Sequence, residues 1–168
     1  MPLQFRFLLF AACIAVAPMV ASPCAAMAAE PAPVLLHNGE RFLRIGNLGF
    51  AKANYDKLIA NYPGTPEAAE AHSDLGVIAA RQGNDALAVA EYEKALAIDG
   101  YPLAHFNLGQ ALLRMLDNGG DPALRAKALH HFLAFQSYLQ SEKPRPPILT
   151  YSMQEVKTEL DDALKRLR

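Results

Sequence analysis

The feature that most constrains the fold is a pair of helical segments within residues 69–102, separated by a short break. The first segment carries Leu75-Gly76, the break is Gly83-Asn84, and the second segment places Ala88, Tyr92 and Ala95 at helical spacing. Small residues at these places let two helices approach closely, because a longer side chain would hold the backbones apart. A single helical pair cannot bury its apolar face, so the sequence predicts further pairs stacked on this one.

Two other stretches repeat the pattern. Upstream, the interval from Gly39 to Ala51 equals that from Gly76 to Ala88, although Asn38 replaces the leucine that precedes the glycine. Downstream, Gly109 follows Gly76 by 33 residues, and its second segment, with Ala128, Phe132 and Phe135, is displaced by seven residues. Because no stretch alternates with the period of a strand, the sequence predicts an all-α fold.

This order of features resembles the tetratricopeptide repeat family over about residues 32–140. The units are residues 32–65 (unit 1), 69–102 (unit 2) and 103–140 (unit 3), with an insertion near residues 117–123. The second segment of unit 3 is predicted to be a long helix from about Pro122 to Gln140. The resemblance implies a right-handed α-solenoid of about three hairpins, whose concave face, lined by the first helices, binds a peptide or a partner helix.

The C-terminal part is predicted to close the array. Residues 141–150 contain three prolines and read as an extended linker. Within residues 151–168, Ser152 and Glu155 form a capping box. Val156, Leu160, Ala163 and Leu167 then share one helix face. We expect a capping helix with a polar outer side; the alternative is an amphipathic segment that docks on a partner.

Residues 1–28 have the layout of a secretory signal peptide. Arg6 precedes an apolar run over residues 7–20, and Ala26-Met27-Ala28 provides small residues for cleavage after Ala28. The interpretation is a bacterial protein exported to the periplasm, with no membrane span in the mature chain. A retained anchor is one alternative, and lipidation is the other, although Pro23 before Cys24 fits a lipid site badly.

Composition and motifs argue against several classes of function. The net charge of −1 and the lack of a basic cluster disfavour nucleic-acid binding. His130 and His131 are adjacent rather than four residues apart, unlike a helical zinc pair, so no metal and no cofactor are expected. No catalytic motif is present, and we predict that the protein is not an enzyme; a metal-dependent hydrolase is a remote alternative.

The arginines Arg44, Arg81 and Arg114 each follow the glycine of their unit by five residues. Equivalent positions in stacked units fall in a line, so the three predict a stripe on or near the concave face that would bind carboxylates of a partner. The alternative is local, since an arginine in the last turn of a helix interacts with the last carbonyls.

Four other residues are candidates for the same groove: Val77, Phe106, Asn107 and Gln110. Val77 and Phe106 would anchor an apolar side chain, and Asn107 would hydrogen-bond a peptide backbone; a core role is the alternative for Phe106. The sequence thus predicts a non-catalytic adaptor for a protein or peptide partner. A self-assembling scaffold, in which end units stack between subunits, is the alternative.

Overall fold

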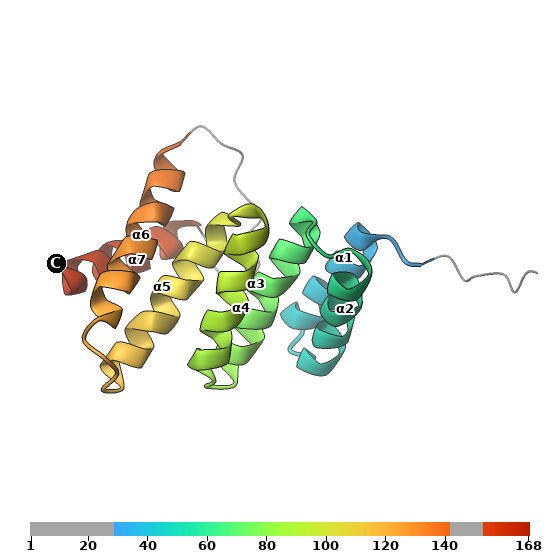
Figure 1. The fold of residues 1–168 in the computed structure, drawn as a ribbon, viewed down its shortest axis with the longest axis horizontal. Coiled ribbons are helices and arrows are strands. Elements are labelled where there is room, and N and C mark those ends of the chain that lie inside the picture. Colours follow the sequence, from blue (N-terminus) through green and yellow to red (C-terminus); the bar gives the residue numbers. More distant parts are fainter. Residues whose placement is uncertain (1–28, 142–152) are drawn as a thin grey trace, which may run out of the picture.

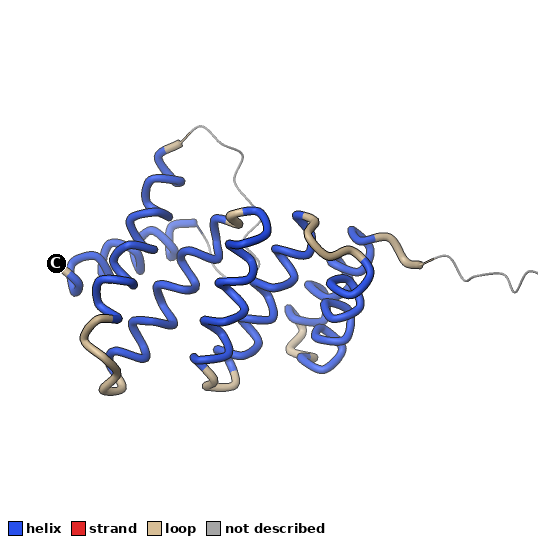
Figure 2. The backbone as a smooth tube through the Cα atoms, viewed as in Figure 1, coloured by secondary structure: helices blue, strands red, loops and turns tan. Residues whose placement is uncertain are grey.

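The structure, a computed structural model, describes residues 29–141 and 153–168, and within them it contains helices and no strand (Figures 1 and 2). This confirms the predicted all-α fold. The helices are α1 (Ala32–Arg44), α2 (Leu48–Asn61), α3 (Pro66–Arg81), α4 (Asp85–Asp99), α5 (Pro102–Asp117), α6 (Leu124–Gln140) and α7 (Met153–Leu167).

Successive helices form antiparallel hairpins that stack into an elongated array (Figure 1). The hairpins are α1–α2, α3–α4 and α5–α6, and α7 lies behind α5 and α6 in this view. The first helices of neighbouring hairpins contact each other, α1 with α3 and α3 with α5. The second helices make no comparable contact among themselves within the described residues. The first helices therefore line the inner side of the array, and the second helices spread apart on the outer side.

The glycine in each first helix allows close packing against an aromatic ring of the second. A Cβ atom at Gly109 would lie 2.8 Å from the ring of Phe132. At Gly76 and Gly39 it would lie closer still to the rings of Tyr92 and Tyr55. These rings are fully buried. The close approach predicted from the glycines is confirmed, and the space that each aromatic residue fills lies within its own unit.

The first two hairpins close through the same turn. Gly46 and Gly83 adopt φ angles of 78° and 76°, a left-handed conformation that favours glycine. The next residue in each turn is an asparagine, Asn47 or Asn84, whose side chain accepts a hydrogen bond from the first turn of the second helix. These caps satisfy helix N–H groups that would otherwise lack partners.

The third hairpin has a longer connection. The helix predicted from Pro122 begins at Leu124, because residues 121–123 form a turn in which Asp121 accepts a hydrogen bond from the backbone N–H of Ala123. The predicted linker and Ser152 of the predicted capping box lie outside the described residues, except for Ser141.

Helix α7 packs on unit 3 as a further first helix would. Leu160-Asp161 corresponds to Leu108-Gly109, and the spacing of the residues that α7 buries follows that of α5. Gln110 donates a hydrogen bond to Glu159 across the two helices. The other side of α7 is polar and exposed; it consists of Gln154, Lys157, Thr158, Asp161 and Lys165.

Two groups of buried apolar residues form the core, one centred on units 1 and 2 and the other on unit 3 and α7. Val77, midway along the array, packs against both. Every helix within residues 29–141 and 153–168 is too short or too polar to be a membrane span.

Candidate functional site

The inner side of the array is the candidate binding surface, and three of the predicted groove residues lie on it with side chains that are partly accessible. Val77 comes from α3, and Asn107 and Gln110 come from α5. Gln110 is already engaged, because its amide donates a hydrogen bond of 3.0 Å to Glu159 of α7. Val77 and Asn107 together offer an apolar and an amide contact near the middle of the surface.

Phe106 lies in the core. Its side chain is 2% exposed, and its ring lies 5.3 Å from that of Phe135 and 6.1 Å from that of Phe132. Helices α6 and α7 enclose it, so this structure leaves no surface of Phe106 for a partner. The core role is therefore the one that the structure gives this residue.

Two of the three arginines of the predicted stripe bind the preceding unit. Arg81 donates a hydrogen bond of 3.3 Å to the backbone carbonyl of Leu43, at the end of α1. Arg114 donates from Nε and Nη2 to Asp85, at the start of α4, with distances of 2.9 and 2.6 Å. The contacts join neighbouring units, which neither the partner-binding hypothesis nor the local one anticipated.

The third arginine, Arg44, differs. Its side chain is exposed and has no hydrogen-bond or ion-pair partner among the described residues. No described unit precedes α1, so the contact that Arg81 and Arg114 make has no counterpart here. Only Glu40, one turn earlier in α1, senses its charge.

Three carboxylates, Glu40, Glu70 and Asp74, lie close enough along α1 and α3 to raise one another's pKa. Asp74 is buried and accepts a hydrogen bond of 2.6 Å from the hydroxyl of Tyr55. Burial raises the pKa of Asp74 to about 7, although the hydrogen bond and Arg81 oppose the shift. Tyr55 belongs to unit 1 and Asp74 to unit 2, so this bond also links two units.

Glu70 forms a similar link to unit 3. It accepts a hydrogen bond of 2.9 Å from the hydroxyl of Tyr101, which precedes α5. Burial raises the pKa of Glu70, and the nearby carboxylates add to the effect. Sequence reasoning missed both tyrosine–carboxylate bonds. Each joins residues that are 19 or 31 positions apart, and no local motif signals them.

Comparison with known proteins agrees with this geometry. Residues 37–102 match the family model described as Tetratricopeptide repeat. The chain is a tetratricopeptide repeat protein. Among curated proteins, none matches it.

Two solved structures share the fold. One is the TPR2B domain of yeast Sti1 in its pHsp70 complex, with a TM-score of 0.59 and 16% identity over 81% of this chain and 94% of that one. The other is the Yersinia enterocolitica type III secretion chaperone SycD with a peptide of the translocator YopD. Its TM-score is 0.61 and its identity 18%, over 80% of this chain and 90% of that one.

The tetratricopeptide repeat units also carry a polar pair that the sequence did not reveal. His72 and Glu91 share a hydrogen bond of 2.7 Å in unit 2, and His105 and His131 share one of 2.9 Å in unit 3. His72 and His105 both lie four residues before the glycine of their unit. Because this position of the repeat is typical of aromatic packing, the sequence predicted no polar partner for either ring.

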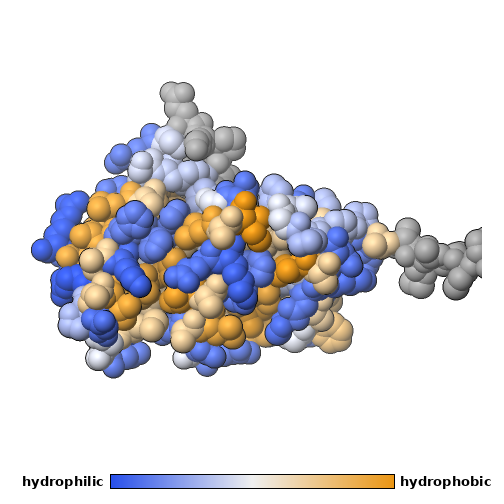
Figure 3. Space-filling view, viewed as in Figure 1, coloured by the Kyte–Doolittle hydropathy of each residue, from blue (hydrophilic) through white to orange (hydrophobic). Residues whose placement is uncertain are grey.

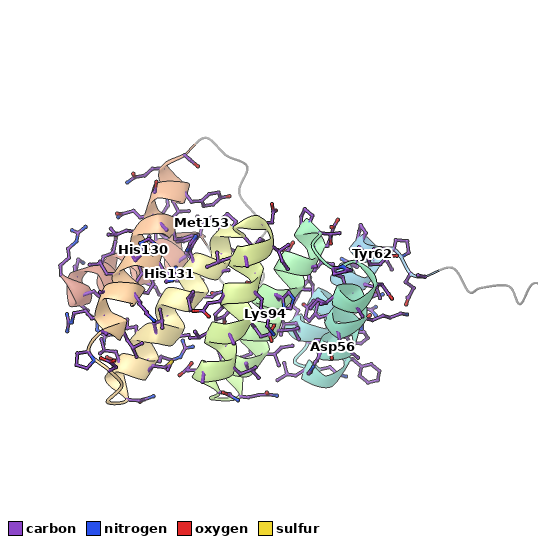
Figure 4. All side chains as sticks on the ribbon, viewed as in Figure 1. Asp56, Tyr62, Lys94, His130, His131 and Met153 are labelled. Atoms are coloured by element: carbon purple, nitrogen blue, oxygen red, sulfur yellow. The ribbon has the colours of Figure 1, made fainter. Side chains whose placement is uncertain are left out.

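Burial keeps the histidines of unit 3 neutral at physiological pH. It lowers the pKa of His105, and it lowers that of His131 to about 4, with smaller contributions from the neighbouring His105, His130 and Lys127. Figure 4 labels His130 and His131 on α6. Among the described residues of this tetratricopeptide repeat protein, no group of three or more His, Cys, Asp or Glu side chains is arranged to hold a metal ion.

Proposed function

We propose that this protein is a non-catalytic adaptor that binds a peptide or helix of a partner protein on the inner side of its helical array. The observation that carries the proposal is the partly accessible surface of Val77 and Asn107 on adjacent first helices. The two similar structures, each a complex with a partner by its title, support it. An array of first helices offers an extended concave surface without the convergent polar groups of a catalytic pocket.

The polar ends of the array favour an adaptor over a self-assembling scaffold. Stacking between copies would place α7 of one copy against α1 of the next. The outer side of α7 carries Lys157 and Lys165, and α1 carries Arg41 and Arg44, so the two faces have like charge. We expect sedimentation to give the mass of a monomer at any concentration; a mass that grows with concentration would favour the scaffold.

We further propose that the adaptor works in the periplasm of a bacterium. The support is the pattern of residues 1–28, with a basic start, an apolar run and small residues before a cleavage point. Osmotic-shock fractionation and mass spectrometry of the N-terminus test it together. Recovery in the cytoplasm with residues 1–28 intact would contradict the proposal, and lipid on Cys24 would replace it with an anchored form.

A pair of matched variants tests the inner side as the binding surface. Val77→Arg places a long cation in the middle of that surface, whereas Ala97→Arg adds the same side chain to the outer part of α4. After crosslinking in intact cells, we expect Val77→Arg to lose the crosslinked partner and Ala97→Arg to retain it. Thermal melting should first show that both variants remain folded.

Asn107→Arg provides a second variant at the same surface, should Val77→Arg not fold. The hydrophobicity view supports the choice of a specific test over a search for an apolar patch, because hydrophilic and hydrophobic residues are interspersed on the face in view (Figure 3). Retention of the same crosslinked partner by folded Val77→Arg and Asn107→Arg would contradict the proposed surface.

A further inference from the structure

One face of the first helices recurs through the chain and is covered in every helix except α1. We call it the upstream face, because it packs against the preceding hairpin. It comprises the residues five before, one before and two after the unit's glycine, with the arginine five after it and the residue that follows. In α5 its apolar members are Ala104, Leu108 and Ala111, and in α7 they are Val156, Leu160 and Ala163; all six are buried.

In α1 the same face is open. Val34, which corresponds to the buried Ala104 and Val156, is 45% exposed. Ile45, which corresponds to Leu167 of α7, is 69% exposed, whereas Leu167 is 4% exposed. The apolar ends of the face therefore remain in α1, although no hairpin in the described residues covers them.

The centre of the face is polar in α1. Asn38 and Arg41 stand where α5 has Leu108 and Ala111. The guanidinium of Arg41 lies 4.9 Å from the centre of the Phe42 ring. An occupant of this face must therefore satisfy polar and cationic groups between two apolar contacts, which a purely apolar helix would not do.

Arginines at the same repeat position show what chemistry Arg44 accepts. Arg81 binds the carbonyl of Leu43 at a helix C-terminus, Arg114 binds Asp85, and Arg166 binds Asp117 at the end of α5 with distances of 2.7 and 2.9 Å. All three contacts reach back to the preceding unit, and all three partners are oxygens at helix ends. Arg44 has no such partner among the described residues.

We propose that the upstream face of α1 docks a helix of another protein whose C-terminal turn carries a carboxylate beside Arg44. The array is thereby continued across two molecules, with Val34 and Ile45 as apolar contacts and Arg41 and Arg44 as the charged ones. This site is separate from the inner side, so it does not depend on the proposed adaptor function. The net positive charge of the face is complementary to an acidic helix end, where free carbonyls add negative potential.

Neither a second copy of the chain nor a general exposure of apolar side chains accounts for this face as well. A second copy would present the lysines of α7, which repel Arg41 and Arg44. Phe50 is exposed too, at 61%, but its counterpart Leu87 in the interior unit 2 is 46% exposed. Exposure of that position is thus shared by the second helices of units 1 and 2, and only the α1 residues mark a face that is elsewhere covered.

The probe for this site is a hydrocarbon-stapled helix with the sequence of residues 102–117. It carries Asp117, the carboxylate that Arg166 binds in the fold. Titrated into the isotopically labelled protein, it should shift the NMR signals of Val34, Arg44 and Ile45. Arg44→Glu should weaken its binding about fivefold, and a probe with Asp117→Lys should recover that loss on the Arg44→Glu protein.

Lys165→Glu, at the opposite end of the array, is the matched control and should leave probe binding unchanged. Signals that shift only on α7 or at Val77, an affinity that ignores Arg44, or no binding at about 1 mM probe would overturn the proposal. Self-association lost in Arg44→Glu would assign the face to a second copy. Binding that appears only after removal of residues 1–28 would assign it to that segment, and either result also overturns the proposal.

Discussion

Helices α3 and α7 occupy equivalent places in the array, but α3 has a second helix packed on it and α7, within the described residues, does not. At one shared position, α3 has Gly76, where a side chain would collide with Tyr92, and α7 has the exposed Asp161. The upstream faces of the two helices are apolar alike, whereas the downstream positions of α7 are polar. Neighbours, and not helix formation, determine which positions of the repeat must be small or apolar.

The largest expected effect compares the residue before the glycine at two places. Leu108 of α5 is fully buried against the preceding hairpin, whereas Asn38 of α1 is only partly buried and has no preceding hairpin among the described residues. Leu108→Ala should lower the free energy of unfolding by about 2–5 kcal/mol, because it removes buried methyl groups and leaves a cavity. Asn38→Ala should change it by less than about 0.5 kcal/mol. Urea denaturation followed by circular dichroism measures both.

Equal costs at the two positions would mean that the upstream face of α1 is covered in solution. That result would contradict the comparison between interior and end. It would also indicate which segment to look for, because only a covered face makes Asn38→Ala strongly destabilising.

The next effect concerns the glycine position itself. Gly76→Ala should destabilise the protein by about 1–3 kcal/mol, because the added methyl group overlaps the buried ring of Tyr92. The gain in helix propensity, about 1 kcal/mol, opposes this loss but does not exceed it. Asp161→Ala makes the same residue in α7 and should be neutral or slightly stabilising. A stable Gly76→Ala protein would show that Tyr92 has room to move.

The sequence was sufficient to predict features that depend on a helix and its nearest neighbour in the chain. The glycine–aromatic pairs and the Gly-Asn turns repeat at fixed spacing, so periodicity alone locates them. The polar contacts between units were not predictable in this way. Arg114 finds Asp85, and Tyr55 finds Asp74, only because stacking brings residues of different hairpins together.

The candidate groove shows the same division. The sequence placed Val77, Asn107 and Gln110 on the first helices, where they are partly accessible. It could not determine that α7 binds Gln110 and helps to enclose Phe106, since the proline-rich segment before α7 interrupts the helical repeat. Side-chain direction on a single helix predicts a face, and the neighbour decides whether that face is free.

A third comparison uses Asp74 and Glu159, which lie two residues before the glycine position in α3 and α7. Asp74 is buried and its pKa is raised to about 7, whereas Glu159 is exposed. Because the folded-state pKa exceeds the unfolded value, the stability associated with Asp74 is present below about pH 4 and is lost as the pH rises through 7. Asp74→Asn keeps an acceptor for Tyr55 without the charge.

At pH 8, Asp74→Asn should therefore be more stable than the wild type, by on the order of 2 kcal/mol, and at pH 5 the difference should shrink. Tyr55, Glu40, Glu70 and Arg81 are the titratable or charged groups around this carboxyl. The matched variant Glu159→Gln should change stability by less than about 0.5 kcal/mol. If Asp74→Asn were less stable than the wild type at pH 8, the carboxylate would be needed in its charged form.

The smallest expected effect compares the histidine pairs of units 2 and 3, which occupy one repeat position. His72 faces a carboxylate, Glu91, whereas His105 faces the imidazole of His131. The folded-state pKa of His131 is lowered to about 4, so the stability of this pair is present above about pH 6.5 and is lost as the pH falls toward 4. His131→Glu gives unit 3 the pairing of unit 2, in which protonation of His105 strengthens the contact. At pH 5 the variant should lose about 1 kcal/mol less stability than the wild type does, relative to pH 7, in urea titrations at the two pH values. His37→Gln, at an exposed position of α1, is the control for removing a histidine. An acid loss that is the same in His131→Glu and the wild type would place the pH sensitivity of the array outside unit 3, because no other change separates the two proteins.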